Sequence, residues 1–303
     1  MTTPPRILIT GATGLLGRPV LRACRDVAGW SVTGTAFSRA APGLERLDLS
    51  QTDAIPAFLD RLAPDVIIHT AAERRPDVSE KDPAGTRRLN VGSTGALAQW
   101  CAARGAFLIY LSSDYVFDGT QPPYAPESPT HPINTYGQSK LDGELAILAT
   151  GCDAALLRVP ILYGEVESLG ESPVTVLAKN MLSARPGERL AMEHWATRYP
   201  TYTPDVAVVL RQMAERRLAD PAFKGIFHWS GDEPMTKYEM ALAFAPLLRF
   251  DPSRLIADAT PPAGAPRPKD CHLDSSRLEQ LGIGRRTPFA QTIPAILAPH
   301  LPA

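Results

Sequence analysis

The stretch RILITGATGLLG, residues 6–17, gives the strongest indication of the fold. Its first part (6–10) is a largely apolar run without polar alternation, typical of a strand buried on both faces of a sheet. GATGLLG (11–17) follows at once, and a helical pattern begins at Leu15. Glycines placed in this way allow a tight turn and a close approach of the backbone to a pyrophosphate, to which the helix N-terminus offers N–H groups. The stretch predicts a dinucleotide-binding unit, although glycines also mark plain turns.

Strand runs and helical patterns continue to alternate through the first half of the chain. This β–α order, with strands that lack polar alternation, predicts an α/β fold with a doubly wound parallel sheet of the Rossmann type. We expect residues 1–163 to form this domain. Residues 164–303, where the regularity weakens, are expected to form mainly a smaller C-terminal substrate-binding lobe, with some segments returning to the Rossmann sheet. Further strands are expected at residues 30–35, 65–70, 106–111 and 154–159, and helices at 15–28, 54–62, 83–104 and 135–149.

The composition excludes several classes of protein. The 303 residues contain 31 Lys plus Arg against 32 Asp plus Glu, a net charge of −1, whereas nucleic-acid and anionic-membrane partners usually demand a basic excess. No apolar run approaches the roughly 18 residues of a membrane span. The first expected strand begins within about five residues of the N-terminus, which leaves no room for a signal peptide. We therefore expect a cytoplasmic location with neither nucleic acid nor membrane as partner.

The cysteines and histidines form no recognisable metal or disulfide pattern. Cys24, Cys101, Cys152 and Cys271 lie far apart without a CxxC pair, and the six histidines are scattered. Structural zinc ligands are usually spaced closely in pairs. The sequence therefore predicts free thiols in a reducing compartment and no metal site.

The end of the second expected strand indicates the type of dinucleotide. NAD-binding sites usually carry an acid there, on the ribose 2′-hydroxyl, but TAFSR (35–39) holds none. Arg39, with Ser38 beside it, can instead bind a 2′-phosphate through charge-assisted hydrogen bonds, and Arg18 could add to them. Taken alone, an arginine at this position is more commonly a solvated surface residue. The missing acid and the present base together predict NADP(H), with Asp48-Leu49 beside the adenine.

The motif YGQSK (136–140) places a phenol and an ammonium on one helix face, because residues four apart in a helix are neighbours. A tyrosine has an ordinary pKa near 10, which makes it a poor acid–base catalyst at neutral pH. We expect the ammonium of Lys140 to lower the pKa of Tyr136 towards the working range. Many helices contain this spacing by chance, so the motif needs a second observation.

That observation is the segment LSSDY (111–115) at the end of a predicted strand. Open α/β sheets place their ligands at the carboxyl ends of their strands. Ser113 could therefore donate a hydrogen bond to a substrate carbonyl, with Ser112 as the less favoured candidate. Serines at strand ends also cap the following turn, so the structural role stays open beside the catalytic one.

These motifs identify the sequence as a member of a known class. Through GATGLLG (11–17), SSD (112–114) and YGQSK (136–140) it resembles the extended short-chain dehydrogenase/reductases. Within them it resembles the dTDP-4-dehydrorhamnose reductase group, through SSDYVFDG (112–119), YGQSKLDGE (136–144) and RPKDCHLDSSRLEQLG (267–282). The regulatory β subunits of methionine adenosyltransferase belong to that group, and the chain is similar to them in AAERRPDV (71–78), LRVPILYGEVE (157–167), FHWSGDEPMTKYEM (227–240) and LGIGRRTPF (281–289).

The resemblance implies roles for individual residues. Ser113, Tyr136 and Lys140 would be the catalytic trio, and Asp114, Arg198 and Thr201 would face the substrate. Ala71, Ala72 and Asn90 would lie at the cofactor, and Pro160 and Ile161 near the nicotinamide. The predicted cofactor-binding set is therefore Gly11, Thr13, Gly14, Leu15, Leu16, Gly17, Ser38, Arg39, Asp48, Leu49, Ala71, Ala72, Asn90, Tyr136, Lys140, Pro160 and Ile161.

Two functions follow from the resemblance. One is an NADPH-dependent reductase of a 4-keto sugar nucleotide or another ketone. The other is an NADP-binding regulatory subunit that binds the methionine adenosyltransferase catalytic subunit and affects S-adenosylmethionine synthesis. The segments in the second half favour the regulator. The final residues 294–303 lack the longer tail through which the β subunit meets its partner, and this favours the reductase, which we expect by a small margin.

Overall fold

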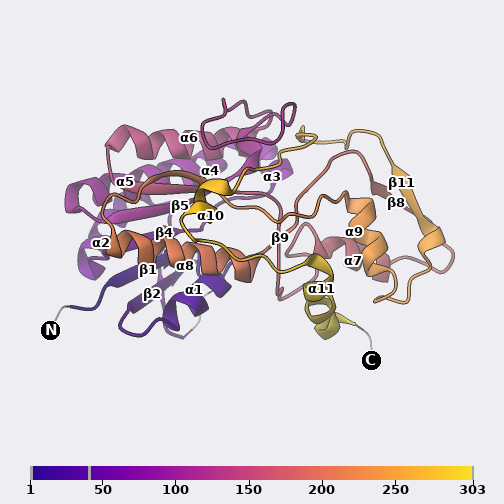
Figure 1. Cartoon of the computed structure of the whole chain (residues 1–303), viewed down its shortest axis with the longest axis horizontal. Coiled ribbons are helices and arrows are strands. Elements are labelled where there is room, and N and C mark those ends of the chain that lie inside the picture. The colour runs from indigo at the N-terminus through magenta and orange to yellow at the C-terminus, as the bar shows by residue number, and fades with distance from the viewer. Residues whose placement is uncertain (1–2, 40–41, 302–303) are drawn as a thin grey trace.

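The computed structural model describes residues 3–39 and 42–301, and its larger part, at the left in Figure 1, is built on a seven-stranded sheet. The strand order is β10-β6-β5-β4-β1-β2-β3, and every neighbouring pair is parallel. This confirms the predicted α/β fold with a doubly wound parallel sheet. The strands are β1 (Arg6–Thr10), β2 (Ser31–Ala36), β3 (Leu44–Arg46), β4 (Val66–His69), β5 (Phe107–Ser113), β6 (Ala154–Val159) and β10 (Gly225–His228).

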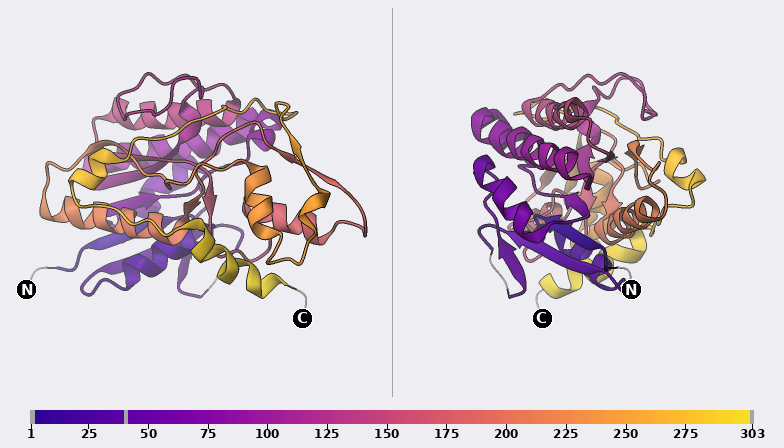
Figure 2. Two further views of the ribbon diagram at one scale, coloured as in Figure 1. Left: turned by 45° about the vertical axis from the view of Figure 1, so that its right-hand side comes forward. Right: turned by 90° about the vertical axis from the view of Figure 1, so that its left-hand side faces the viewer.

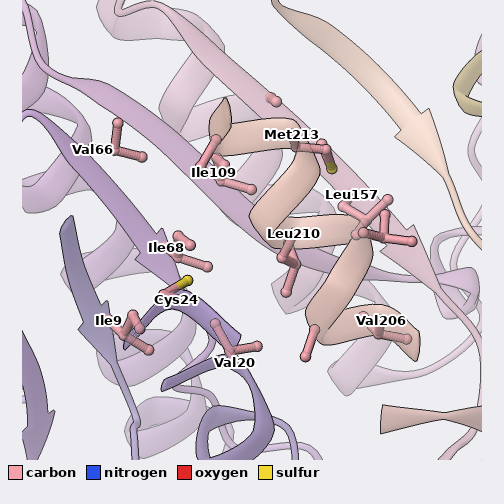
Figure 3. Packing of buried hydrophobic residues seen from close by; sticks show 14 of the residues in the cluster. Ile9, Val20, Cys24, Val66, Ile68, Ile109, Leu157, Val206, Leu210 and Met213 are labelled. Atoms are coloured by element: carbon pink, nitrogen blue, oxygen red, sulfur yellow. The ribbon is translucent and has the colours of Figure 1, made fainter. Parts of the chain in front are cut away.

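Helices cover both faces of the sheet, because its strands carry apolar side chains on both sides. On β1, Ile7 and Ile9 belong to the core beneath α1 and α8, whereas Leu8 belongs to the core beneath α2, α5 and α6. Figure 3 shows the first of these cores. In the right-hand view of Figure 2, α8 and the pair α5 and α6 lie on opposite sides of the sheet. The helices are α1 (Gly17–Arg25), α2 (Ile55–Leu62), α5 (Ser93–Arg104), α6 (Thr135–Thr150) and α8 (Thr203–Ala219).

The predicted helix over residues 83–104 contains a π-helical turn. It runs as α4 (Pro83–Arg87), the π turn (Arg88–Gly92) and α5. The hydroxyl of Thr94 donates to the carbonyl of Asn90 at 2.8 Å, and such side-chain bonds compete with regular helix pairing. The remaining short elements around the sheet are α3 (Pro76–Lys81), α10 (Ser276–Gln280) and 3₁₀ turns at Thr52–Ala54 and Asp114–Val116.

A smaller lobe with its own apolar core lies beside the carboxyl ends of the strands, at the right in Figure 1. Its core joins residues of α7, α9 and α11, such as Met181, Phe244 and Ile293. The lobe comprises β7 (Leu162–Tyr163), α7 (Thr175–Leu182), β8 (Leu190–Glu193), β9 (Thr201–Tyr202), α9 (Lys237–Phe244), β11 (Leu255–Asp258), α11 (Phe289–Leu297) and 3₁₀ turns at Pro252–Arg254 and Ala298–His300. Two parallel pairs, β7 with β9 and β8 with β11, complete it.

The second half of the chain also contributes to the large sheet. Helix α8 packs against α1, and β10 pairs with β6 through the register Phe227 to Leu157. These two elements return to the sheet after the chain has entered the lobe. The division of the chain near residue 163 stays a prediction. None of the helices in residues 3–39 and 42–301 has the length and apolarity that crossing a bilayer requires.

Candidate active site

A cavity of about 710 Å³ opens at the carboxyl ends of the strands, between the sheet and the lobe. Its sheet side is formed by the glycine turn after β1 and by the ends of β2, β4, β5 and β6. Its lobe side is formed by Thr197, Arg198 and Lys237. The cavity therefore joins a candidate cofactor region to a candidate substrate region, as expected for an open parallel sheet.

The glycine turn has a shape that other residues would disrupt. Gly11 has φ +69°, and a Cβ there would lie 2.9 Å from the Cα of Ala71. A Cβ on Gly17 would collide with the Gly11 carbonyl. Helix α1 begins after Leu16 with neither a side-chain cap nor an acid in its first turn. Its N–H groups therefore face a cleft lined by Gly14 and Leu16, an arrangement that fits a pyrophosphate.

Ser112 and Ser113, neighbours at the end of β5, make different hydrogen bonds. The Ser112 hydroxyl donates to Glu144, which also pairs with Arg158 at 2.7 Å in the core. The Ser113 hydroxyl faces the cleft, donates to Asp114 Oδ1 at 3.0 Å and accepts from the Tyr115 amide at 3.2 Å. Both serines line the cavity, but the Ser112 hydroxyl is committed to the buried ion pair, whereas the Ser113 hydroxyl caps the turn that follows β5.

Tyr136 and Lys140 both line the cleft from the first turns of α6. The helix starts at this point because the side chain of Asn134 accepts a hydrogen bond from the Gly137 amide at 2.8 Å. Burial raises the pKa of Tyr136 to about 12, although the Ser113 hydroxyl acts to lower it. The predicted lowering of the Tyr136 pKa by Lys140 is therefore wrong for this state, because desolvation of the phenol is the largest influence on that pKa.

The ammonium of Lys140 rests on an aromatic ring. Its Nζ lies 4.1 Å from the centroid of the Tyr110 ring on β5, a cation–π distance. Burial lowers the pKa of Lys140 to about 7, and the carboxylate of Glu144 acts in the opposite direction. Gly143 makes room for this arrangement, because a Cβ there would collide with the Tyr110 hydroxyl.

The lobe side of the cleft is rich in positive charge. Arg198 pairs with Glu193 at 2.6 Å, and Arg267 pairs with Asp77 at 2.5 Å. Among the described residues no carboxylate lies within ion-pair distance of Lys237, whose pKa burial lowers to about 8. Burial also raises the pKa of Asp114 to about 7, although Ser113 and Arg198 act to lower it. The cleft thus presents groups that can bind an anion and a carbonyl oxygen at one end.

The structure brings most of the predicted site residues to this cavity. It does not bring Asn90 there: the Asn90 amide accepts from the Glu73 amide at 2.8 Å and donates to the Ser139 hydroxyl at 2.9 Å. Nor does it bring Thr201, whose hydroxyl accepts from Gly231. The predicted residues that line the cavity are Gly11, Thr13, Gly14, Leu15, Leu16, Gly17, Ser38, Arg39, Asp48, Leu49, Ala71, Ala72, Ser113, Asp114, Tyr136, Lys140, Pro160, Ile161 and Arg198.

Arg18 also differs from its predicted place near a phosphate. It does not line the cavity, and both of its terminal nitrogens bond to the carboxylate of Glu171, at 2.8 and 2.9 Å. Four charged residues line the cavity without having been predicted from the sequence: Arg74, Glu171, Lys237 and Arg267. No spacing rule distinguishes them, although three of them lie in segments that carry the family resemblance.

The four cysteines are free thiols, as predicted. Burial raises the pKa of Cys24 to about 12, and Cys101 and Cys271 are buried as well. In residues 3–39 and 42–301 no three His, Cys, Asp or Glu side chains are grouped so as to hold a metal ion.

Comparisons with known proteins agree with the motifs. A family model described as the RmlD substrate binding domain matches residues 5–301. The methionine adenosyltransferase 2 subunit beta of Mus musculus is 51% identical over 298 residues, covering 98% of this chain and 88% of that protein. The dTDP-4-dehydrorhamnose reductase of Aggregatibacter actinomycetemcomitans is 29% identical over 289 residues, covering 91% of this chain and 92% of that protein. A crystal structure of dTDP-4-dehydrorhamnose reductase from Bacillus anthracis in complex with NADP superposes with a TM-score of 0.81 at 22% identity, covering 99% of both chains.

Proposed function

The chain belongs to the RmlD substrate binding domain family, and from that premise we propose that it binds NADP(H) and reduces a keto group. The observation that carries the proposal is the convergence of Ser113, Tyr136 and Lys140 on one cavity with the glycine turn. The amides at the start of α1 would hold the pyrophosphate, and Arg39 would reach the 2′-phosphate. The NADP in the Bacillus anthracis reductase supports this choice of cofactor.

The three side chains fit the reduction of a ketone to an alcohol. NADPH, when bound, supplies a hydride to the carbonyl carbon. Ser113 would donate a hydrogen bond to the carbonyl oxygen and polarise it. Tyr136, protonated at neutral pH because burial raises its pKa to about 12, would deliver the proton to that same oxygen. Lys140 would hold the nicotinamide ribose and attract the phenolate that forms.

The charges on the lobe side support an anionic substrate. Lys237, Arg198 and Arg267 line the cleft at the end where a substrate would meet Ser113. Guanidinium and ammonium groups are suited to phosphate oxygens. We therefore propose a 4-keto sugar nucleotide as the substrate class, in agreement with the name of the Aggregatibacter relative.

A regulatory role is the second candidate. It is favoured by one specific observation, the 51% identity to the mouse methionine adenosyltransferase 2 subunit beta over 98% of this chain. In that case the cleft would bind NADP(H), and the partner would be the catalytic subunit of methionine adenosyltransferase. The catalytic trio does not separate the two candidates, because a cofactor needs the same cleft in both.

The deciding experiment measures NADPH oxidation over a panel of 4-keto-6-deoxy sugar nucleotides and simple ketones. We expect turnover by the unaltered protein and a loss of about 10²- to 10⁴-fold in Tyr136→Phe, which removes the proton donor. Tyr202→Phe, on β9 outside the cleft, is the matched control and should keep full activity. NADPH binding without turnover on any ketone would end the reductase proposal. A direct binding assay with the methionine adenosyltransferase catalytic subunit would then test the regulatory role.

A further inference from the structure

A short acidic segment from the second half of the chain crosses the cofactor end of the cleft. We call residues 165–171 the acidic strap; it joins β7 to α7 and carries Glu165, Glu167 and Glu171. Glu171 lines the cavity, and the other two carboxylates lie further out. The strap contacts residues more than 90 positions away in sequence: Arg18, Arg22, Arg39 and Arg74 of the first half, and His300, whose Nε2 lies 3.2 Å from the Val166 carbonyl oxygen.

Arg18 and Arg74 tie the inner end of the strap to the sheet. Arg18 makes a bidentate ion pair with the Glu171 carboxylate and also donates a hydrogen bond to the Glu165 carbonyl at 3.0 Å. Arg74 donates to the Glu171 carbonyl. The Glu171 carboxylate is only 12% exposed, so this part of the strap is well shielded from water. Bidentate arginine–carboxylate pairs are stronger and more directional than pairs held by a single hydrogen bond.

Arg39 meets the outer part of the strap. Its Nη1 lies 2.8 Å from Glu167 Oε2 and 3.5 Å from Glu171 Oε1. Glu167 also lies 3.4 Å from Arg18 Nη1. Arg39 is the residue at the end of β2 that fits a 2′-phosphate, and here it already has a carboxylate partner. The cluster of Arg18, Arg39, Glu167 and Glu171 therefore holds two positive and two negative charges.

We propose that the acidic strap sets the selectivity between NADPH and NADH, with Glu167 as the determining residue; this inference rests on the proposed binding of NADP(H). A 2′-phosphate carries nearly two negative charges at neutral pH. To bind Arg39 it must displace Glu167 or share the guanidinium with it, and either event costs free energy that NADH does not incur. The strap thereby weakens NADPH binding relative to what Arg39 alone would give.

Glu167 and Glu171 differ in a way that directs the experiment. Glu171 holds the strap through Arg18, so its removal would disturb the whole cleft wall. Glu167 is 59% exposed, and among the described residues its carboxylate pairs with Arg18 and Arg39, so Glu167→Gln removes one charge and leaves the contacts of Glu171 in place. Glu165 offers a matched control on the same segment: its carboxylate pairs with Arg22, and neither residue lines the cavity.

The experiment is calorimetric titration of the full chain with NADPH and with NADH. Glu167→Gln should tighten NADPH binding by about threefold to tenfold, the scale of an exposed charge interaction with a doubly charged group, and should leave NADH within about twofold. Arg39→Gln should weaken NADPH and spare NADH. Glu165→Gln should change neither dissociation constant.

Each outcome bears on a different claim. If the unaltered protein binds NADPH and Glu167→Gln leaves the ratio of the two dissociation constants unchanged, the strap proposal is wrong and the cofactor proposal stands. Equal changes for both cofactors would also overturn it, because the strap would then act on the cleft as a whole. If the unaltered protein binds neither dinucleotide, the cofactor proposal fails and the strap proposal fails with it.

Discussion

The buried ion pair between Glu144 and Arg158 lies directly behind the candidate active site. The carboxylate accepts from Arg158 Nε at 2.9 Å, from Arg158 Nη2 at 2.7 Å and from the Ser112 hydroxyl. The two side chains are only 2% and 3% exposed. Arg158 also donates to the Pro126 carbonyl at 3.2 Å. The guanidinium therefore depends on one carboxylate for its charge compensation.

Glu144→Gln keeps the shape of the side chain and removes that compensation. Leaving one partner of a buried pair without the other costs about 3–5 kcal/mol of unfolding free energy. The exposed pair of Glu45 and Arg61, at 3.0 Å and 42% and 55% exposed, provides the control. Glu45→Gln should cost about 1 kcal/mol or less, because water screens exposed charges and solvates the partner left behind.

Urea denaturation at pH 7, followed by circular dichroism and by tryptophan fluorescence, measures both variants. Agreement between the two probes is needed before a single free energy is extracted from a chain of this size. Glu144→Gln should shift the midpoint far more than Glu45→Gln. If the free energies of unfolding of the two variants lie within about 1 kcal/mol of each other, the argument that Arg158 depends on Glu144 for charge compensation is wrong.

Two further predictions concern Lys140. Tyr110→Leu removes the ring that contacts the Lys140 ammonium and should lower the pKa of Lys140 by about one unit. The reason is that a desolvated cation–π contact is worth about 1–2 kcal/mol. Tyr110→Phe keeps the ring and should leave that pKa unchanged. The pH profile of NADPH affinity reports the difference, and identical profiles for the two variants would contradict it. Burial lowers the pKa of Lys140 from 10.5 to about 7 in the folded chain. Between pH 7 and pH 10.5 the lysine is therefore protonated in the unfolded chain and neutral in the folded chain. The free energy of unfolding consequently rises with pH across that window. Lys140→Met should therefore raise the thermal midpoint at pH 6–7 and lose that advantage towards pH 10, and a gain that does not change with pH would refute the burial argument.

The parts of the site that the sequence predicts well are local. The turn over residues 11–17 and the pair Tyr136 and Lys140 depend on a few consecutive residues, whose spacing fixes their relative positions in a turn or on a helix face. Ser113 follows from its place at the end of a strand, because parallel strands deliver their carboxyl ends to one edge. Local rules were therefore enough to find the catalytic candidates.

The parts that the sequence does not predict depend on contacts between distant segments. The position of Arg18 after the last glycine predicts a phosphate contact, but its guanidinium pairs with Glu171, 153 residues away. Lys237 reaches the cleft only because α9 begins there, capped by Thr236. The pKa of Tyr136 depends chiefly on the burial of its phenol in the folded chain, and helical spacing does not contain that information.

The place of β10 at the edge of the large sheet bears on how the chain acquires its fold during synthesis. β6 (154–159) gains its outer partner only when residues 225–228 have left the ribosome, after the whole stretch from β7 to α8. Until then β6 presents a row of unpaired N–H and C=O groups, and α1 lacks the apolar surface of α8. A nascent chain that pauses in this interval would expose an edge on which other strands can add. The interweaving of the two halves thus favours completion of the sheet and of the cleft in one late step.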